Sequence, residues 1–251
     1  MIYLTIQEFF ERYPRVAVAV SGGVDSSYLL YAAKKYAEQV KGYYVRSEFQ
    51  PRFEWEDAMR LAKELDAEVE TVSLNVLSIP DVRRNPTDRC YYCKRAIFTE
   101  IAQRAAEDGY TVLLDGTNAS DDAGDRPGMR ALAELSVLSP LRECGLTKRR
   151  IRELSREAGL FTWDKPAYAC LATRIETGEE ITPEKLTATE TAESFLFSIG
   201  FSDLRVRASN GNARIQVPSD QIERLIAYRE RILAELLKYY RTVSLDLEVR
   251  K

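Results

Sequence analysis

The feature that most constrains the fold is an apolar run that ends in a glycine-rich turn. Residues 16–20 read Val-Ala-Val-Ala-Val, which is typical of a strand buried on both faces of a parallel sheet. The turn Ser-Gly-Gly-Val-Asp-Ser-Ser follows over residues 21–27, and a helix is expected over about 25–38. A strand, a tight turn and a helix in this order form the first half of a βαβ unit.

The same alternation continues through the first part of the chain. Further strands are expected over 42–46, 67–74 and 111–115, with helices over 5–13, 53–65 and 90–108. This pattern predicts an α/β domain with a doubly wound parallel sheet over residues 1–165.

Beyond this point the pattern changes. Residues 161–180 resemble a loop, and Thr182-Pro183 is a helix start with Pro at the first helical position. Alternating strands then flank Asn210-Gly211, a strong hairpin signal. The remaining elements are a helix over 183–199, the two strands over 203–207 and 213–217, a helix over 218–238 and a strand over 242–247. A second, smaller α+β domain is therefore expected over residues 166–251.

The turn at residues 21–27 is suited to bind phosphate. Gly22 and Gly23 allow a sharp turn and a close approach to an anion. The following helix offers N–H groups and the positive end of its dipole, and the hydroxyls of Ser21, Ser26 and Ser27 add donors. No Gly-Lys-Ser/Thr follows, so this is not a Walker A loop. The sequence predicts a site for nucleotide phosphates; a plain tight turn is the alternative.

A second polar block follows the strand at 111–115. Loops beyond the carboxyl ends of parallel strands line the ligand crevice of such folds. Asp121 and Asp122 could help to hold Mg²⁺ against the phosphates, although an Asx-rich turn would look the same. The nucleotide-binding candidates outside the first turn are Gly116 and Thr117 in the block Asp115-Gly116-Thr117-Asn118, and Arg46 and Ser47 at the end of the second strand, for adenosine.

The chain has four cysteines and no histidine. This excludes an imidazole base, a Ser-His-Asp triad and a His-ligated zinc site. Cys90 and Cys93 form a CxxC pair at a helix start among basic residues, which favours the thiolate, and Cys170 is the natural third thiolate. The pair alone is compatible with redox, zinc or iron–sulfur chemistry, or with inward packing. Cys144 has no partner in the sequence, so a packing role is expected for it.

Arginines in the second domain suggest a site for a substrate phosphate. Arg205 and Arg207 are two apart on a strand, so they share one face, and guanidinium groups suit phosphate. Glu193 on the preceding helix could orient them, and Arg174 in the cysteine loop is a further candidate. A solvated strand face is the alternative.

Together these segments resemble one family. The motifs SGGVDSS, CYYCK, DGTN, the cysteine loop at 166–174 and LRVR followed by ARI are similar to those of the LarE family, ATP-dependent sacrificial sulfur transferases of the PP-loop ATP pyrophosphatase type. The resemblance spans nearly the whole chain. It implies that ATP is split between its α and β phosphates, with the pyrophosphate held at the glycine-rich turn. It also implies adenylation of a carboxylate on a pyridinium dicarboxylate mononucleotide, replacement of the activated oxygen by sulfur, and a place in nickel-pincer cofactor assembly.

The resemblance also suggests roles for particular residues. Some family members sacrifice a single cysteine, whereas others carry two more and use a 4Fe–4S cluster with a labile sulfide. Cys90, Cys93 and Cys170 place this chain with the second group, with Cys170 and Asp25 as its catalytic candidates. Whether the sulfur comes from the cluster or from Cys170 itself stays open. The loop departs from the family pattern at Tyr168, where proline is usual.

Bulk composition limits the partners. Acidic residues exceed basic ones, 39 against 36, which does not suggest a nucleic-acid-binding protein. No apolar run could span a membrane, and the N-terminus lacks a signal pattern, so a cytoplasmic enzyme with a small-molecule nucleotide substrate is expected. The family suggests a hexamer. Two alternatives remain: a tRNA-thiolating PP-loop enzyme, and an amide-forming synthetase of the NAD or GMP type, which leaves the cysteines unexplained.

Overall fold

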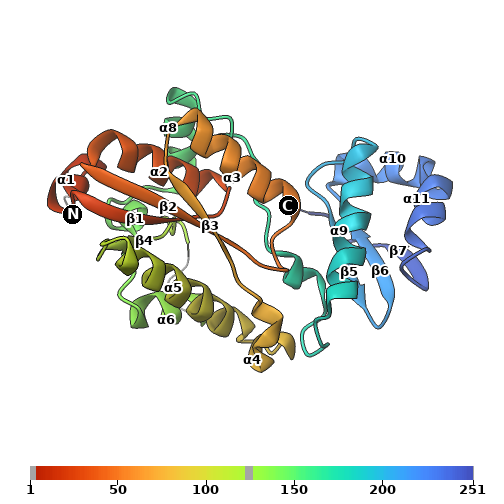
Figure 1. The fold of residues 1–251 in the computed structure, drawn as a ribbon. Helices are drawn as coiled ribbons and strands as arrows, with labels where there is room; N and C mark the ends of the chain where they lie inside the picture. Colours follow the sequence, from red (N-terminus) through yellow and green to blue (C-terminus); the bar gives the residue numbers. More distant parts are fainter. Residues whose placement is uncertain (1–3, 122–126, 251) are drawn as a thin grey trace. The chain divides into compact units, whose positions relative to one another are not determined.

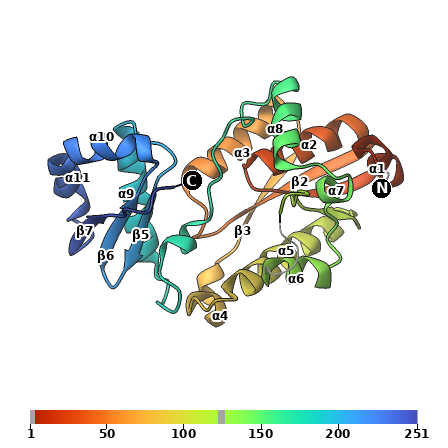
Figure 2. The same cartoon turned by 180° about the vertical axis from the view of Figure 1, so that it is seen from behind.

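The computed structural model describes residues 4–121 and 127–250, and it consists of two compact units. One contains Met1–Val76 and Asp88–Lys165, and the other Leu77–Thr87 and Pro166–Lys251. Figures 1 and 2 show the elements of each unit from opposite sides.

The first unit is built on a parallel sheet of four strands in the order β3-β2-β1-β4. The strands are β1 (Arg15–Val20), β2 (Gln39–Arg46), β3 (Val69–Ser73) and β4 (Leu113–Leu114). Since the two strands beside β1 are parallel to it, their carboxyl ends and the loops that follow lie at one edge of the sheet. The predicted α/β class with a parallel sheet is confirmed, and β4 is shorter than the strand expected over 111–115.

Helices cover both faces of this sheet (Figure 1). They are α1 (Ile6–Arg12), α2 (Val24–Tyr36), α3 (Arg52–Glu64), α5 (Arg89–Glu107), α6 (Pro127–Glu134), α7 (Pro140–Glu143) and α8 (Lys148–Glu157). The expected capping box holds the start of α1: Thr5 Oγ1 accepts from Glu8 N, and the Glu8 carboxylate accepts from Thr5 N at 2.7 Å.

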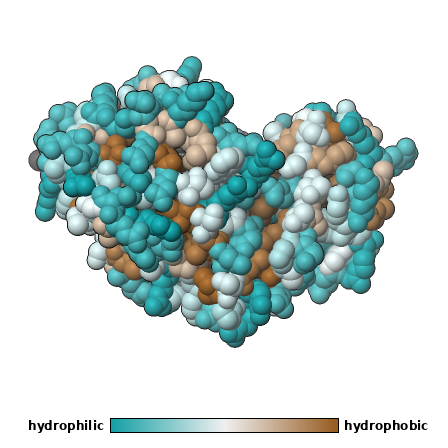
Figure 3. Space-filling model, viewed as in Figure 1, coloured by the Kyte–Doolittle hydropathy of each residue, from teal (hydrophilic) through white to brown (hydrophobic). Residues whose placement is uncertain are grey.

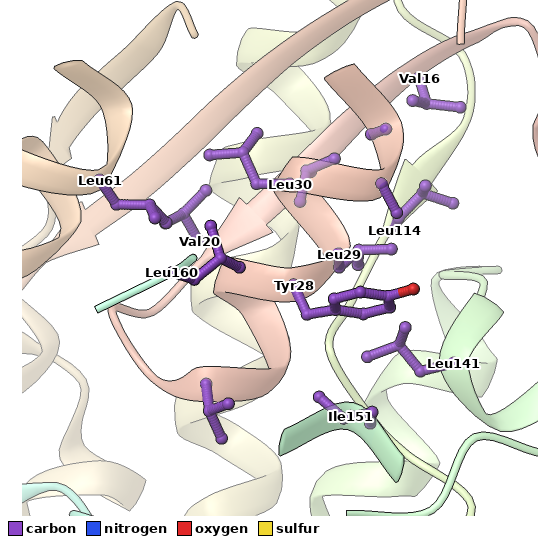
Figure 4. Packing of buried hydrophobic residues seen from close by; sticks show 14 of the residues in the cluster. Val16, Val20, Tyr28, Leu29, Leu30, Leu61, Leu114, Leu141, Ile151 and Leu160 are labelled. Carbon is purple, nitrogen blue, oxygen red and sulfur yellow. The ribbon is translucent and has the colours of Figure 1, made fainter. Parts of the chain in front are cut away.

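Side chains of β1 alternate between two cores. Val16 and Val20 face a cluster with α1, α2, α3 and α8, including Leu29, Leu61 and Ile151 (Figure 4). The opposite face of the sheet packs on α5 and α6 through a second cluster, formed by Ala17, Tyr43, Val45, Val72, Phe98, Ile101, Ala105, Leu113, Leu132 and Val137. Burial on both faces explains why the strand is continuously apolar.

The second unit has a three-stranded sheet in the order β5-β6-β7. Its elements are η2 (Leu171–Arg174), α9 (Pro183–Ser198), β5 (Arg205–Ser209), β6 (Asn212–Gln216), η3 (Ser219–Gln221), α10 (Ile222–Ala227), α11 (Arg229–Leu236) and β7 (Thr242–Leu245). The expected hairpin joins antiparallel β5 and β6, with positive φ at Asn210 and Gly211 as its turn requires. Strand β7 adds parallel to β6.

The prediction of a single helix over residues 218–238 is wrong. The chain forms η3 and then two helices that meet at Tyr228, whose φ of −92° and ψ of 7° depart from helical values. The Tyr228 ring packs edge-on against Phe201 with centroids 6.0 Å apart. The break coincides with this tertiary contact. The sequence around Tyr228 contains no proline or glycine that would have predicted it.

Residues 77–87, including α4 (Pro80–Arg83), pack with the second unit although they lie within the range expected for the first domain. Asn85 is 1% exposed and donates from Nδ2 to Glu176 O at 2.9 Å, while its own carbonyl accepts from Gly178 N at 2.8 Å. The chain therefore enters the second unit twice.

The described helices include none that is long and apolar enough to cross a membrane. The exposed large apolar side chains include Ile226 of α10, Leu233 of α11 and Leu237, which directly follows α11. Figure 3 shows brown atoms over this part of the second unit, among hydrophilic neighbours. Scattered apolar side chains of this kind are ordinary on a protein surface.

Candidate active site

The turn between β1 and α2 has a backbone that glycine alone accommodates well. Gly22 has a φ of +77°, and a Cβ at this position would lie 2.5 Å from the carbonyl oxygen of Glu54. A side chain here would force the turn away from α3. The SGGVDSS pattern thus encodes a backbone shape as well as a chemical group.

Three serines hold the turn in shape. Ser26 Oγ accepts from Ser21 N at 3.1 Å and donates to Gly23 O at 3.2 Å. Ser27 Oγ donates to the same carbonyl at 2.8 Å. Helix α2 begins here with Gly23 as its N-cap, and no side chain in the described structure caps it. Its first N–H groups and its dipole are therefore suited to bind an anion.

The block after β4 lies directly against this turn. A Cβ on Gly116 would lie 3.0 Å from Ser26 N, so glycine permits the two backbones to approach. The carboxylate of Asp115 accepts from Thr117 Oγ1 and, at 2.6 Å, from Ser139 Oγ. The hydroxyl of Thr117 and the acid of Asp115 therefore shape this loop. The structure brings Gly116 beside the phosphate turn, because β4 is the neighbour of β1, and Thr117 follows Gly116 in the same loop.

The Asp25 carboxylate has one oxygen in an ion pair and one buried oxygen without a hydrogen bond among the described residues. Lys148 Nζ donates to Asp25 Oδ2 at 2.6 Å, while Oδ1 is buried and makes no hydrogen bond among the described residues. Burial raises the pKa of Asp25, and Lys148 opposes that rise. An orphaned carboxylate oxygen beside a phosphate turn suits Mg²⁺, which commonly binds one or two carboxylates plus substrate phosphates.

The other acidic candidates make a weaker case for a metal. Asp121 accepts from Asn118 N at 3.0 Å, and Asp122 lies outside the described residues. Within the described ranges, no three Asp, Glu or Cys side chains gather to hold a metal ion. A magnesium ion at Asp25 would thus take most of its ligands from phosphate and water.

The adenosine candidates lie where β2 ends. Arg46 is the last residue of this strand, and its guanidinium lies 5.1 Å from the centre of the Trp55 ring. Ser47 donates from Oγ to Gln50 Oε1 at 2.6 Å, which closes a turn. Both lie at the same sheet edge as the phosphate turn, because β2 is parallel to β1 and next to it.

The CxxC pair occupies the first turn of α5. Cys90 is exposed and Cys93 is partly buried. Arg89 donates from Nη2 to the sulfur of Cys90 at 3.6 Å, and Tyr91, between the cysteines, donates to Glu134 Oε2 at 2.7 Å. The turn that carries both thiols is therefore anchored to α6.

Cys144 differs from the other cysteines. It is 8% exposed in the first core, and burial raises its pKa to about 11. The four cysteines are all described, and none of them forms a disulfide. The environment of Cys144 is that of a packing residue.

The Cys170 loop is held from inside the second unit. Arg174 is 1% exposed and pairs with Glu193, donating from Nε at 2.8 Å and from Nη2 at 3.1 Å. Its Nη1 donates to Ala169 O and to Thr173 Oγ1, both at 2.8 Å, and more distantly to Cys170 O. Arg174 therefore holds the backbone at Ala169 and Cys170 and the side chain of Thr173.

Glu193 joins this loop to the second sheet. Its carboxylate accepts from Val206 N at 2.8 Å and from the Tyr168 hydroxyl, besides Arg174. Two guanidinium groups lie over the Tyr168 ring, that of Arg174 4.5 Å and that of Arg205 4.8 Å from the ring centre. One buried acid thus orders α9, β5 and the loop.

The two arginines of β5 also contact this loop. Arg205, 5% exposed, donates from Nη2 to Ala167 O at 2.6 Å and from Nη1 to Leu204 O at 2.7 Å. Arg207 donates from Nη1 to Thr173 O at 3.3 Å. The structure therefore brings all four substrate-phosphate candidates together with Cys170 in one unit.

Comparison with known proteins decides the family. A family model described as asparagine synthase matches residues 11–123. The chain is 34% identical over 236 residues to the pyridinium-3,5-bisthiocarboxylic acid mononucleotide synthase of Lactiplantibacillus plantarum, covering 93% of this chain and 86% of that protein. The chain belongs to the LarE family. It is thus an ATP-dependent sulfur transferase with a PP-loop domain.

Two further relatives extend over the same length. An uncharacterized protein of Synechocystis sp. is 36% identical over 250 residues, covering 97% of this chain and 92% of that protein. Another, from Methanocaldococcus jannaschii, is 29% identical over 236 residues and covers 94% and 90%. Similarity to these relatives therefore extends well beyond residues 11–123, which the family model matches.

Sequence reasoning missed two lysines of this LarE-family site. Lys148 pairs with Asp25, and Lys165 donates from Nζ to Gly22 O at 2.9 Å and to Asp57 Oδ2 at 2.6 Å. Lys148 lies 123 residues after Asp25 in the sequence, and Lys165 lies 143 residues after Gly22. No motif marks them, because the fold alone brings them to the phosphate turn.

Proposed function

We propose that this LarE-family enzyme adenylates a carboxylate of a pyridinium dicarboxylate mononucleotide and replaces the activated oxygen with sulfur, in nickel-pincer nucleotide cofactor synthesis. The observation that carries the proposal is the match along nearly the whole chain to a protein named for a pyridinium bisthiocarboxylic acid mononucleotide product. The geometry of the phosphate turn supports its first step.

In the first step, a substrate carboxylate oxygen attacks the α-phosphorus of ATP. The bond between that phosphorus and the bridging oxygen breaks, and pyrophosphate leaves with the electron pair. The N–H groups at the start of α2 and the turn at Ser21, Gly22 and Gly23 stabilise the leaving group. Asp25 would hold Mg²⁺ against the phosphates, and Ser26, Ser27, Gly116 and Thr117 shape the site. Arg46 and Ser47 are assigned to adenosine.

In the second step, a sulfur nucleophile attacks the carbonyl carbon of the acyl adenylate. The bond from carbon to the AMP oxygen breaks, and AMP leaves with that electron pair. A hydrosulfide nucleophile gives the thiocarboxylate directly. The Cys170 thiolate would first give a thioester, and the thiocarboxylate would then leave as Cys170 loses its Cα proton and its Cβ–Sγ bond breaks, so that residue 170 becomes dehydroalanine. Cys170 is assigned as the residue that presents the sulfur, either its own or one that it helps to hold.

A 4Fe–4S cluster is proposed with Cys90, Cys93 and Cys170 as ligands. Cys90 and Cys93 support this proposal, since they are three apart on one turn of α5, on neighbouring positions of the helix surface, and Cys90 is exposed. When bound, the cluster would supply a transferable sulfide at the iron that lacks a protein ligand. A renewable sulfide spares the protein from losing a side chain.

Arg205 and Arg207 are proposed to bind the substrate phosphate, with Arg174 and Glu193 beside them. Burial, together with the nearby cations Arg174 and Arg250, lowers the pKa of Arg205 to about 10. Arg174 is paired with Glu193, and a phosphate dianion would offset the positive charges of Arg205 and Arg207 on the neighbouring strand.

Product analysis tests the reaction. With ATP, Mg²⁺ and the pyridinium dicarboxylate mononucleotide, the enzyme should release AMP and pyrophosphate and yield a thiocarboxylate. ADP and phosphate would overturn the proposal. For the cluster, iron and sulfide should be present after anaerobic purification, and a Cys90→Ala variant that kept a normal cluster would refute this ligand set.

We also propose a cytoplasmic homo-hexamer that acts on a small-molecule nucleotide, without a nucleic-acid or membrane partner. The resemblance and the mildly acidic composition support this assignment. Light scattering of the purified enzyme tests the hexamer, and a monomeric mass would refute it.

A further inference from the structure

The backbone on both sides of Cys170 is held by three guanidinium groups. The bonds, in order along the loop, are Arg205 to Ala167 O at 2.6 Å, Arg174 to Ala169 O at 2.8 Å and to Cys170 O at 3.4 Å, and Arg207 to Thr173 O at 3.3 Å. Two of these donors are the arginines assigned to the substrate phosphate. Ligand binding and loop position therefore depend on the same side chains.

Electrostatics makes this arrangement sensitive to an anion. The pKa values of Arg205 and Arg207 are lowered by burial and then by neighbouring arginines, of which Arg174 and Arg250 act on both, while Asp246 partly opposes the effect on Arg207. Both cations are therefore repelled by other guanidinium groups. Glu193 is the buried acid that pairs with Arg174. A phosphate at Arg205 and Arg207 would relieve the repulsion and hold both guanidinium groups in place.

A bound phosphate need not displace the loop. A guanidinium has five N–H donors on three nitrogens. The bond from Arg207 to the loop uses Nη1, and those from Arg205 use Nη1 and Nη2. The remaining N–H groups of each guanidinium can donate to a phosphate while the loop carbonyls stay bound. A lysine has a single ammonium nitrogen and lacks this planar arrangement of donors.

We propose that the substrate phosphate fixes the Cys170 loop through Arg205 and Arg207, so that phosphate occupancy and the placement of the Cys170 thiol are energetically coupled. The inference rests on the proposed function, because it assumes that these arginines receive the phosphate. In this role both arginines are also positioning residues for Cys170. Coupling is reciprocal, so a fixed loop favours phosphate binding by the same factor.

Amide hydrogen exchange tests the coupling. The probe is nicotinamide mononucleotide, a pyridinium mononucleotide, and nicotinamide riboside is the matched ligand without the phosphate. Exchange is measured for the peptide that contains residues 167–173, at concentrations that saturate the full-length protein by calorimetry. The mononucleotide should slow exchange there by roughly fivefold or more, the lower end of usual coupling factors, and the riboside should not.

Variants separate coupling from binding. Arg207→Lys keeps the cation but loses the fork, so saturating mononucleotide should protect the loop less than in the wild type. Arg214 is the matched control, since it lies opposite Arg207 in the hairpin and pairs with Asp246 at 3.3 Å. Arg214→Lys should show wild-type protection.

The outcomes distinguish the two proposals. Binding of the mononucleotide without slower exchange in the loop, or with faster exchange, would overturn the coupling and leave the phosphate site intact. Equal protection in Arg207→Lys and wild type would also overturn it. If the wild-type protein does not bind the mononucleotide at all, the phosphate assignment in the proposed function fails, and the coupling fails with it.

Discussion

Replacement of Glu193 by glutamine should destabilise the second unit strongly. Glu193 is 1% exposed, and its carboxylate accepts from Nε and Nη2 of Arg174, from Val206 N and from the Tyr168 hydroxyl. Glu193→Gln keeps the shape but leaves Arg174 as a buried cation without its counter-ion. Removal of one partner of such a pair typically costs about 3–5 kcal/mol.

This loss is large against the total stability of a domain, which is about 5–15 kcal/mol. Urea unfolding followed by far-ultraviolet circular dichroism reports on both units. Tryptophan fluorescence reports on the first unit, because Trp55 and Trp163, the two tryptophans of the chain, lie there. The variant should lose dichroism at lower urea, with little shift of the fluorescence transition.

The matched control is Glu223→Gln, an exposed glutamate of α10. Its free energy of unfolding should stay within about 0.5 kcal/mol of wild type, as for most surface substitutions. If Glu193→Gln also lies within about 0.5 kcal/mol of wild type, the range of a surface change, then Glu193 does not hold the loop and sheet together.

Three further predictions concern the first unit. Gly22→Ala should reduce ATP binding at least roughly tenfold, the effect of about 1.4 kcal/mol, since its Cβ would meet Glu54 O; Gly159→Ala has a similar φ of +70° but open space and should leave ATP binding, measured by calorimetry, unchanged. Burial raises the pKa of Asp25, so the folded state binds this proton more tightly and the free energy of unfolding falls as pH rises from the ordinary Asp range through the raised value. Asp25→Asn should remove that fall in pH-dependent urea unfolding while abolishing pyrophosphate release, and a variant that still releases pyrophosphate would contradict the role of Asp25. Cys144→Ala should keep wild-type iron content after anaerobic purification, because this thiol is buried with a pKa of about 11; a loss of iron without unfolding would place it among the ligands.

Local sequence signals predicted much of the fold. The capping box of α1, the start of α9 after Thr182 and the hairpin at Asn210 depend on residues within a few positions, and all three were found. The strand–turn–helix at the phosphate site is local in the same way. These elements could be predicted because short-range hydrogen bonds and backbone preferences decide them.

Long-range contacts account for what could not be predicted. Tyr228 interrupts the last long helix without a local breaker, and Asn85 joins a segment of the first half of the chain to the second unit. Lys148 reaches Asp25 across 123 residues. The arginines at β5 were chosen for phosphate, but their bonds to loop carbonyls follow from tertiary packing alone.

Mass spectrometry of the complete reaction tests the central claim most directly. The purified enzyme is incubated anaerobically with ATP, Mg²⁺ and the pyridinium dicarboxylate mononucleotide, and the nucleotides and the modified substrate are identified together. ATP-dependent sulfur transfer predicts AMP and pyrophosphate in step with a substrate in which one carboxylate oxygen has become sulfur. AMP and pyrophosphate with an amide product, or a thiocarboxylate formed without ATP, would contradict it.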